Sequence, residues 1–164
     1  MRLRSLLVLL VAAASTTVPG CSCTRGPQVA EKMPYALCIE SSSRLNWFDD
    51  RANTLFVRVF QLSSTDAFQQ ADAARLLARD AMPPGLLGTP MDRNLFPGTK
   101  ATLDMRLDPD AVALGVVAGY FRAQGMTKVV RQIARPSDDD DANEAEAAKQ
   151  KACMAFGPNG IEAP

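Results

Sequence analysis

The sequence predicts a mainly β domain, an antiparallel β-sandwich with one inserted helix, behind an N-terminal export signal and a tether. Short apolar runs rich in β-branched and aromatic residues recur along the chain between turn residues, as is typical of strands. Only one segment in the middle of the chain spaces its apolar residues as a helix does. Strands joined by short turns, with a single helix, indicate a sandwich with a helical elaboration.

The strongest strand prediction covers residues 54–62. This run is apolar on both faces, which indicates a central strand covered by core on one side and by a helix on the other. In residues 101–107, apolar and polar side chains alternate, as expected for a strand with one face in the core. We expect further strands at residues 35–40, 111–121, 127–134 and 151–156.

The inserted helix is expected at residues 67–80, where Thr65 or Asp66 provides the cap and Met82 to Gly85 ends it. A second helical stretch is expected at residues 142–150. Between the domain body and that stretch, residues 138–141 are four adjacent aspartates. A calcium loop alternates its ligands and needs a glycine for its turn. We therefore interpret the acidic run as a solvated loop and predict no metal site.

Residues 1–20 are expected to be a signal peptide. Arg2 and Arg4 precede an apolar run at 6–14 that is far shorter than the roughly 20 residues of a membrane span. A cysteine directly after the cleavage zone is typical of a lipoprotein, which predicts cleavage between Gly20 and Cys21 and acylation of Cys21. The alternative is an ordinary export signal with an incidental cysteine.

Removal of the signal leaves 144 of the 164 residues, divided into a tether at 21–33 and one domain at 34–164. The chain has 18 basic and 18 acidic residues, so charge gives no reason to expect nucleic-acid binding. It has no histidine, which excludes Ser-His-Asp and Cys-His catalysis and histidine-ligated metal sites. We predict that the protein is not an enzyme and carries no cofactor apart from the lipid on Cys21.

Two cysteines of the domain are candidates for a disulfide. Cys38 and Cys153 each lie in an expected strand, on the face that points away from the main core. If these strands are neighbours, the two sulfur atoms meet. The alternative is a pair of buried thiols, since free cysteine is often buried. Cys23 lies in the tether and is expected to be unpaired.

Several segments of the chain resemble one protein family. These are the lipoprotein signal, the strand segment 57–62 (Val-Arg-Val-Phe-Gln-Leu), the helix centred on Phe68, and Leu-Phe-Pro-Gly at 95–98. The last is Leu-Gly-Val-Val-Ala-Gly-Tyr at 114–120. Together they resemble the outer-membrane lipoprotein of type VI secretion systems, the TssJ (SciN/VasD) family, over roughly residues 35–135.

The resemblance implies a transthyretin-like β-sandwich attached by acyl chains to the outer membrane and facing the periplasm. It also implies that the protein binds the periplasmic domain of the inner-membrane component TssM. The alternative function is that of a generic periplasmic lipoprotein whose sandwich binds a carbohydrate or another small ligand.

In this family the loop between the first two strands binds the partner, which here points to residues 43–53. The candidate contact residues are Arg44, Asn46, Trp47, Phe48 and Asp49. Aromatic side chains surrounded by charges suit a binding hot spot. Two alternatives stay open from the residues alone: Trp47 packs either on a partner or into the core, and Arg58 is either a contact or a buried arginine under the helix.

Overall fold

The structure, a computed structural model, describes residues 31–133 and 153–162. These residues form eight strands and two short helices. In chain order they are β1 (Met33–Ser41), β2 (Leu55–Leu62), α1 (Asp66–Gln70), α2 (Ala73–Leu77), β3 (Leu86–Leu95), β4 (Lys100–Leu107), β5 (Ala113–Ala118), β6 (Lys128–Gln132), β7 (Met154–Phe156) and β8 (Ile161–Glu162).

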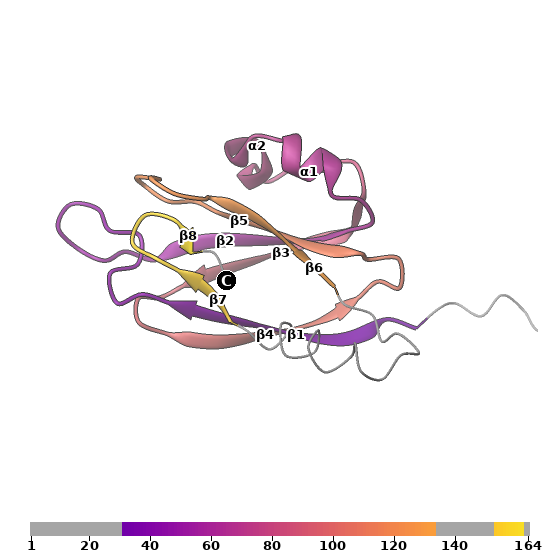
Figure 1. Ribbon diagram of the computed structural model, residues 1–164, viewed down its shortest axis with the longest axis horizontal. Coiled ribbons are helices and arrows are strands. Elements are labelled where there is room, and N and C mark those ends of the chain that lie inside the picture. Colours follow the sequence, from indigo (N-terminus) through magenta and orange to yellow (C-terminus); the bar gives the residue numbers. More distant parts are fainter. Residues whose placement is uncertain (1–30, 134–152, 163–164) are drawn as a thin grey trace, which may run out of the picture.

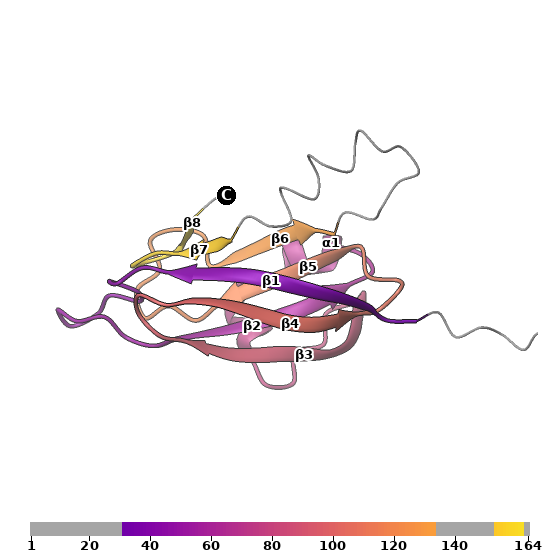
Figure 2. The same cartoon turned by 90° about the horizontal axis from the view of Figure 1, so that it is seen from below.

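The strands form two sheets of four, in the orders β4-β1-β7-β8 and β3-β2-β5-β6. The sheets lie face to face, and both helices cover the outer face of the second sheet (Figure 1). Seen from below, β1 and β4 of the first sheet lie in front of β2 of the second (Figure 2). The predicted mainly β sandwich with a helical insertion is confirmed.

One strand pair departs from the antiparallel pattern. β1 pairs with β4 in antiparallel register and with β7 in parallel register, so that Ile39 lies beside Met154. Parallel neighbours cannot be joined by a tight turn and need a long connection. Most of the domain lies between β1 and β7 in the chain. The sequence of the short run at β7 therefore did not indicate that it pairs in parallel with β1.

The main core lies between the sheets, and β2 contributes Leu55, Val57 and Val59 to it. The opposite face of β2 and β5 forms a second core with the helices, in which Phe60 and Val117 pack with Phe68 and Leu76. Side chains alternate between the two faces of a strand. The expectation that the segment 54–62 is covered on both faces is therefore confirmed.

Gly115 of β5 allows α1 to lie close to the sheet. A Cβ atom at this position would lie 2.7–2.8 Å from three ring atoms of Phe68, which is fully buried. Phe68 in turn packs edge-on against Phe60, with 5.5 Å between ring centroids. The contact between Phe68 and Gly115 therefore holds α1 against the sheet.

Arg58 holds α2 to the same face, which confirms the interpretation of a buried arginine under the helix. Its side chain is 6% exposed, and its guanidinium donates to both carboxylate oxygens of Asp92 in β3 at 2.6 and 2.8 Å. The same group donates to the carbonyl oxygens of residues 76–78 at the C-terminal end of α2. The hydrogen bond from Arg58 lowers the pKa of the Asp92 carboxyl and raises that of Arg58.

A second cation ends α1. The ammonium group of Lys128 in β6 donates to the carbonyl oxygens of Phe68, Gln69 and Ala71. The last carbonyls of a helix have no partner within the helix and attract cations. Each helix therefore has its C-terminal end fastened to a strand of the sheet beneath it.

The single helix predicted at 67–80 is wrong in its extent. Two five-residue helices replace it, because Ala71 has extended backbone and Asp72 starts a new helix by accepting a hydrogen bond from the amide of Ala74. Aspartate at such a position competes with the helical hydrogen bonds and favours a cap. The second helix ends at Leu77, where Arg58 takes up the carbonyl oxygens.

Strand β3 had no counterpart among the predicted elements. Gly88 and Pro90 interrupt its apolar pattern, which obscured the strand in the sequence. β3 is an edge strand, where such residues are tolerated, and its pairing with β2 shifts register between Val59 and Gln61. A turn at 157–160 joins β7 to the short strand β8, which was also not predicted.

Several predictions concern residues outside the described part of the chain. These are the signal peptide with Gly20 and Cys21, nearly all of the tether, the acidic loop at 138–141 and the helix at 142–150. The strand predicted at 111–121 is shorter than expected and spans Ala113–Ala118.

Replacing Gly115 by alanine is expected to lower the free energy of unfolding by about 1–3 kcal/mol, because the new methyl group overlaps the Phe68 ring. Thermal and urea denaturation measure the change. Gly119→Ala is the matched control, since its nearest atom, in Leu77, would lie at an ordinary 3.6 Å. Equal stability of the two variants would contradict the packing described for α1.

Candidate functional site

Four connections meet at one end of the sandwich, which we call the loop end. They are the β1–β2 loop (residues 42–54), the β3–β4 turn (96–99), the β5–β6 loop (119–127) and the β7–β8 turn (157–160). All four lie at the left of Figure 1, away from the helices. The chain enters β1 at the opposite end of the molecule (Figure 1).

The β1–β2 loop carries a tight hairpin at its tip. Phe48 and Arg51 pair through two backbone hydrogen bonds, of 3.0 and 3.3 Å. The two residues between them, Asp49 and Asp50, have φ angles of 55° and 54°. Two consecutive left-handed residues form the tight turn that suits a hairpin, and aspartate tolerates this conformation better than most residues. Both carboxylates therefore stand at the exposed tip.

Asn53 fastens the loop from within. Its side-chain amide donates to the carbonyl oxygens of Asn46, Phe48 and Arg51 at 3.0–3.2 Å. Its backbone amide donates to the carbonyl of Leu45, a fully buried residue that ties the base of the loop to the main core. The loop thus has a single defined shape with its own hydrogen bonds.

Asn46 joins two of the connections. It is only 1% exposed and has a φ of 47°, which asparagine adopts more readily than most side chains. Its amide nitrogen donates to the carbonyl of Thr54, and its amide oxygen accepts from the backbone N–H of Phe121 in the β5–β6 loop, both at 2.9 Å. Among the candidate contact residues, Asn46 is therefore too buried to touch a partner, and it positions the loop instead.

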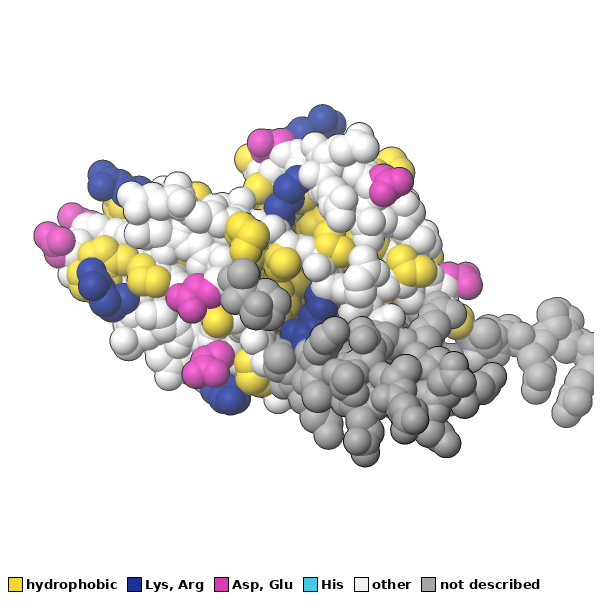
Figure 3. Space-filling view, viewed as in Figure 1, with side chains coloured by type: hydrophobic (Ala, Val, Ile, Leu, Met, Phe, Trp, Pro, Cys, Tyr) yellow, Lys and Arg dark blue, Asp and Glu magenta, His cyan; other side chains and the backbone are white. Residues whose placement is uncertain are grey.

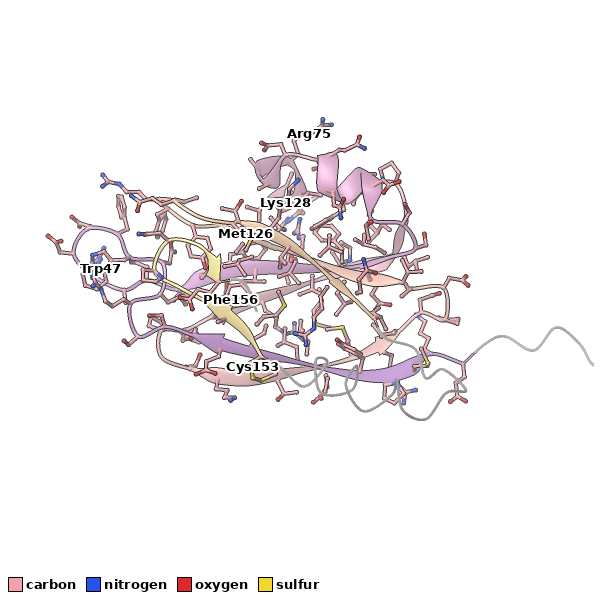
Figure 4. All side chains as sticks on the ribbon, viewed as in Figure 1. Trp47, Arg75, Met126, Lys128, Cys153 and Phe156 are labelled. Atoms are coloured by element: carbon pink, nitrogen blue, oxygen red, sulfur yellow. A yellow bond between two sulfur atoms is a disulfide. The ribbon has the colours of Figure 1, made fainter. Side chains whose placement is uncertain are left out.

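Trp47 lies at the loop end and not in the interior (Figure 4). It is partly exposed and belongs to neither core cluster. The guanidinium of Arg44 stacks over its ring, 4.5 Å from the centroid, and its backbone N–H donates to the carbonyl of Pro158. The indole is thus held in place and keeps part of its surface open to solvent.

Phe48 forms a second aromatic group with the β5–β6 loop. It is 39% exposed, and its ring centroid lies 5.3 Å from that of Phe121, which is 63% exposed. The guanidinium of Arg122 lies 5.5 Å from the centroid of Phe48. Hydrophobic side chains alternate with charged ones on this end of the molecular surface (Figure 3).

Arg44, Trp47, Phe48 and Asp49 all lie in the β1–β2 loop at the loop end and are at least partly exposed, while their role as contacts stays a prediction. The structure adds Phe121 and Arg122, which the sequence reasoning assigned to the end of a strand and its flank. An aromatic residue followed by arginine directly after the apolar strand was the available signal, but the pairing with Phe48 spans more than 70 residues and depends on the fold.

The C-terminal hairpin, β7 and β8 with their turn, supports both loops. Besides the bond from Trp47 to Pro158, the amide of Gln124 donates to the carbonyl of Asn159 at 3.0 Å. A disulfide between Cys38 and Cys153 attaches β7 to β1, with 4.4 Å between the two Cα atoms. The hairpin that supports the loop end is thus covalently joined to β1.

One titratable group of the β5–β6 loop, Tyr120, has a shifted pKa. Burial raises the pKa of the Tyr120 hydroxyl above its usual range, and the negative charge of Glu162 adds to the rise.

Within residues 31–133 and 153–162, no three His, Cys, Asp or Glu side chains are grouped so as to hold a metal ion. In the same residues, no helix has the length and apolar character needed to cross a membrane.

Comparison with known families identifies the class of protein. Residues 34–152 match the model of a family described as type VI secretion lipoprotein, with VasD, EvfM and TssJ as members. The chain belongs to this family. The family predicted from the sequence is therefore confirmed. Because the family consists of secretion lipoproteins and not of enzymes, the predictions that the protein is not an enzyme and has no cofactor are confirmed as well.

Solved structures share the fold. Lip of Serratia marcescens, described as a membrane-bound component of the type VI secretion system, is 21% identical with a TM-score of 0.62, over 79% of this chain and 95% of Lip. A chain of a structure described as the type VI membrane complex is 21% identical with a TM-score of 0.64, over 82% of this chain and 99% of that one.

A third match is a chain from a structure described as the C-terminal domain of the type VI secretion protein TssM from EAEC. It is 22% identical with a TM-score of 0.59, over 80% of this chain and 98% of that one. A comparison with curated proteins found no match.

Replacing Cys38 and Cys153 together by serine is expected to lower the free energy of unfolding by about 2–5 kcal/mol, because the bridge closes a long loop of the unfolded chain. Denaturation measures the loss. Hydrogen exchange should also become faster at the amides of Trp47 and Gln124, which depend on the C-terminal hairpin. Recovery of both thiols in alkylated form from unreduced native protein would contradict the bridge.

Proposed function

We propose that this type VI secretion lipoprotein is anchored in the outer membrane and binds the periplasmic domain of TssM through the β1–β2 loop. Signal cleavage between Gly20 and Cys21 and acylation of Cys21 provide the anchor. Several acyl chains on one cysteine hold a protein stably at a membrane, whereas one chain alone is marginal. Serine at position 22 favours the outer membrane, since lipoproteins kept at the inner membrane tend to have aspartate there.

The observation that carries the proposal is the direction in which β1 runs through the domain. β1 begins at Met33, next to the tether, and ends at Ser41, where the β1–β2 loop begins. Nine residues at about 3.3 Å each span about 30 Å. The start of β1 and the aromatic loop therefore lie at opposite ends of one strand (Figure 1). A domain attached to a membrane through the segment before β1 would present its loop toward the periplasm.

The surface chemistry of the loop fits a protein partner. Trp47 and Phe48 are exposed in part, are fixed by the surrounding hydrogen bonds, and are flanked by arginine and aspartate. Aromatic side chains and arginine dominate binding hot spots between proteins. Chains of this fold also occur in structures described as the type VI membrane complex and as the TssM C-terminal domain, which supports TssM as the partner.

Trp47→Ala is expected to weaken the complex with the TssM periplasmic domain by at least about tenfold, because a hot-spot aromatic contributes about 2 kcal/mol or more. The full chain, purified in detergent, is titrated with the TssM domain by calorimetry. Far-UV circular dichroism should show a melting temperature close to that of the wild type, since Trp47 lies outside both cores.

Met82→Ala is the matched control for that titration, because Met82 is 70% exposed but lies on the segment after α2. This variant should bind like the wild type. A wild-type chain that does not bind the TssM domain would overturn the proposed function.

Cys21→Ser is expected to release the protein from membranes into the soluble periplasmic fraction, because the acyl chains hold it there. Cell fractionation with immunoblotting measures the distribution. Cys23→Ser changes the neighbouring tether cysteine and should leave the protein with the outer membrane. Continued membrane association of Cys21→Ser would mean that the folded domain provides the attachment.

A further inference from the structure

We propose that the β5–β6 loop is the second half of the partner-binding surface, with Phe121 and Arg122 as contact residues that act together with Trp47 and Phe48. This inference rests on the proposed function and deepens it. The matching feature of the TssM periplasmic domain is an apolar pocket that takes the Phe121 ring and is bordered by carboxylates.

The first argument is the exposure of Phe121. A single exposed aromatic residue on a protein surface needs no explanation. Phe121, however, is 63% exposed and packs against the partly exposed ring of Phe48 at 5.3 Å, with an interplanar angle of 42°. The two rings thus form an apolar contact built from two loops, and Trp47 directly precedes Phe48 in the β1–β2 loop.

The second argument is the state of the neighbouring cations. Arg122 lies over Phe48 and Arg44 lies over Trp47, in both cases as a cation on an aromatic face. Neither guanidinium forms an ion pair in the described part of the chain. A stacked guanidinium keeps its N–H groups in the plane of the fork, where they can donate to a carboxylate in pairs. The surface is therefore suited to acidic groups around an apolar centre.

The third argument is that the two loops are held as one body. The buried amide of Asn46 accepts a hydrogen bond from the backbone N–H of Phe121 and donates one to the carbonyl of Thr54, at the end of its own β1–β2 loop. Ordering of side chains and loops on binding costs free energy, and a preformed surface avoids much of that cost. By joining the two loops, Asn46 lowers the cost of ordering them when a partner binds to both.

The C-terminal hairpin contacts both loops. Its turn accepts one backbone hydrogen bond from each, from Trp47 to Pro158 and from Gln124 to Asn159. Gly125 and Gly160 lie so close that a Cβ atom on Gly160 would come within 3.0 Å of the Gly125 backbone. The hairpin therefore contacts both loops, in addition to the direct hydrogen bond between Asn46 and Phe121.

The test compares Phe121→Ala and Arg122→Glu with wild type in titrations against the TssM periplasmic domain. The full chain in detergent is used, with Met82→Ala as the control, since Met82 is 70% exposed against 63% for Phe121 and lies on another part of the surface. Each loop variant should weaken binding at least tenfold at an unchanged melting temperature. Arg122→Lys should lose less affinity than Arg122→Glu, because it keeps the charge.

A double-mutant cycle of Phe48→Ala and Phe121→Ala examines whether the two loops act as a unit. If they do, the double variant loses less affinity than the product of the two single losses, because either truncation already disrupts the shared apolar surface. Purely multiplicative losses would overturn the claim that the two rings bind together.

Each outcome bears on a separate claim. If wild type binds and Trp47→Ala weakens binding while Phe121→Ala and Arg122→Glu bind like wild type, the proposed function stands and the inference is overturned. If wild type does not bind, both fail. Sedimentation of the chain alone should show a monomer; a dimer that Phe121→Ala dissociates would assign the surface to a second copy of the chain.

Discussion

The buried guanidinium of Arg58 is the constraint on which the helical side of the structure depends. A charge removed from water is tolerated only where it is paired and fully hydrogen-bonded. Asp92 lies directly opposite it in β3, and the C-terminal carbonyls of α2 lie above it. The β2–β3 register and the position of α2 are thus fixed by the needs of one side chain, while Phe68 on Gly115 and the ammonium of Lys128 place α1 beside it.

The loop end follows the same principle with an amide in place of a charge. Asn46 is buried, so both ends of its side chain need partners, and these lie in two different connections. The backbone of the β1–β2 loop forms hydrogen bonds with Asn53 and with the 157–160 turn, which leaves side chains such as Phe48 at the surface. The domain thus combines a hydrogen-bonded support with an aromatic and cationic surface at the end opposite the start of β1.

Much of the fold was predictable because burial leaves a periodic pattern. The alternation in 101–107 and the two-sided apolar run of 54–62 identify strands β4 and β2 and the covering helix. The pattern failed where local chemistry interrupted it. Gly88 and Pro90 hid the edge strand β3, and Asp72 divided one expected helix into two. At the site, the residues of the β1–β2 loop were predictable as a group, but the burial of Asn46 was not.

The sequence by itself determined the class of protein, because the strand pattern and the family motifs are local properties of the chain. The tertiary structure decided which distant residues meet. Phe121 reaches Phe48, Cys153 reaches Cys38, and the 157–160 turn lies under two loops only after the sheets have formed. Such contacts leave no periodic trace in the sequence, because they depend on the strand order and on one parallel pairing, and not on the spacing of neighbouring residues.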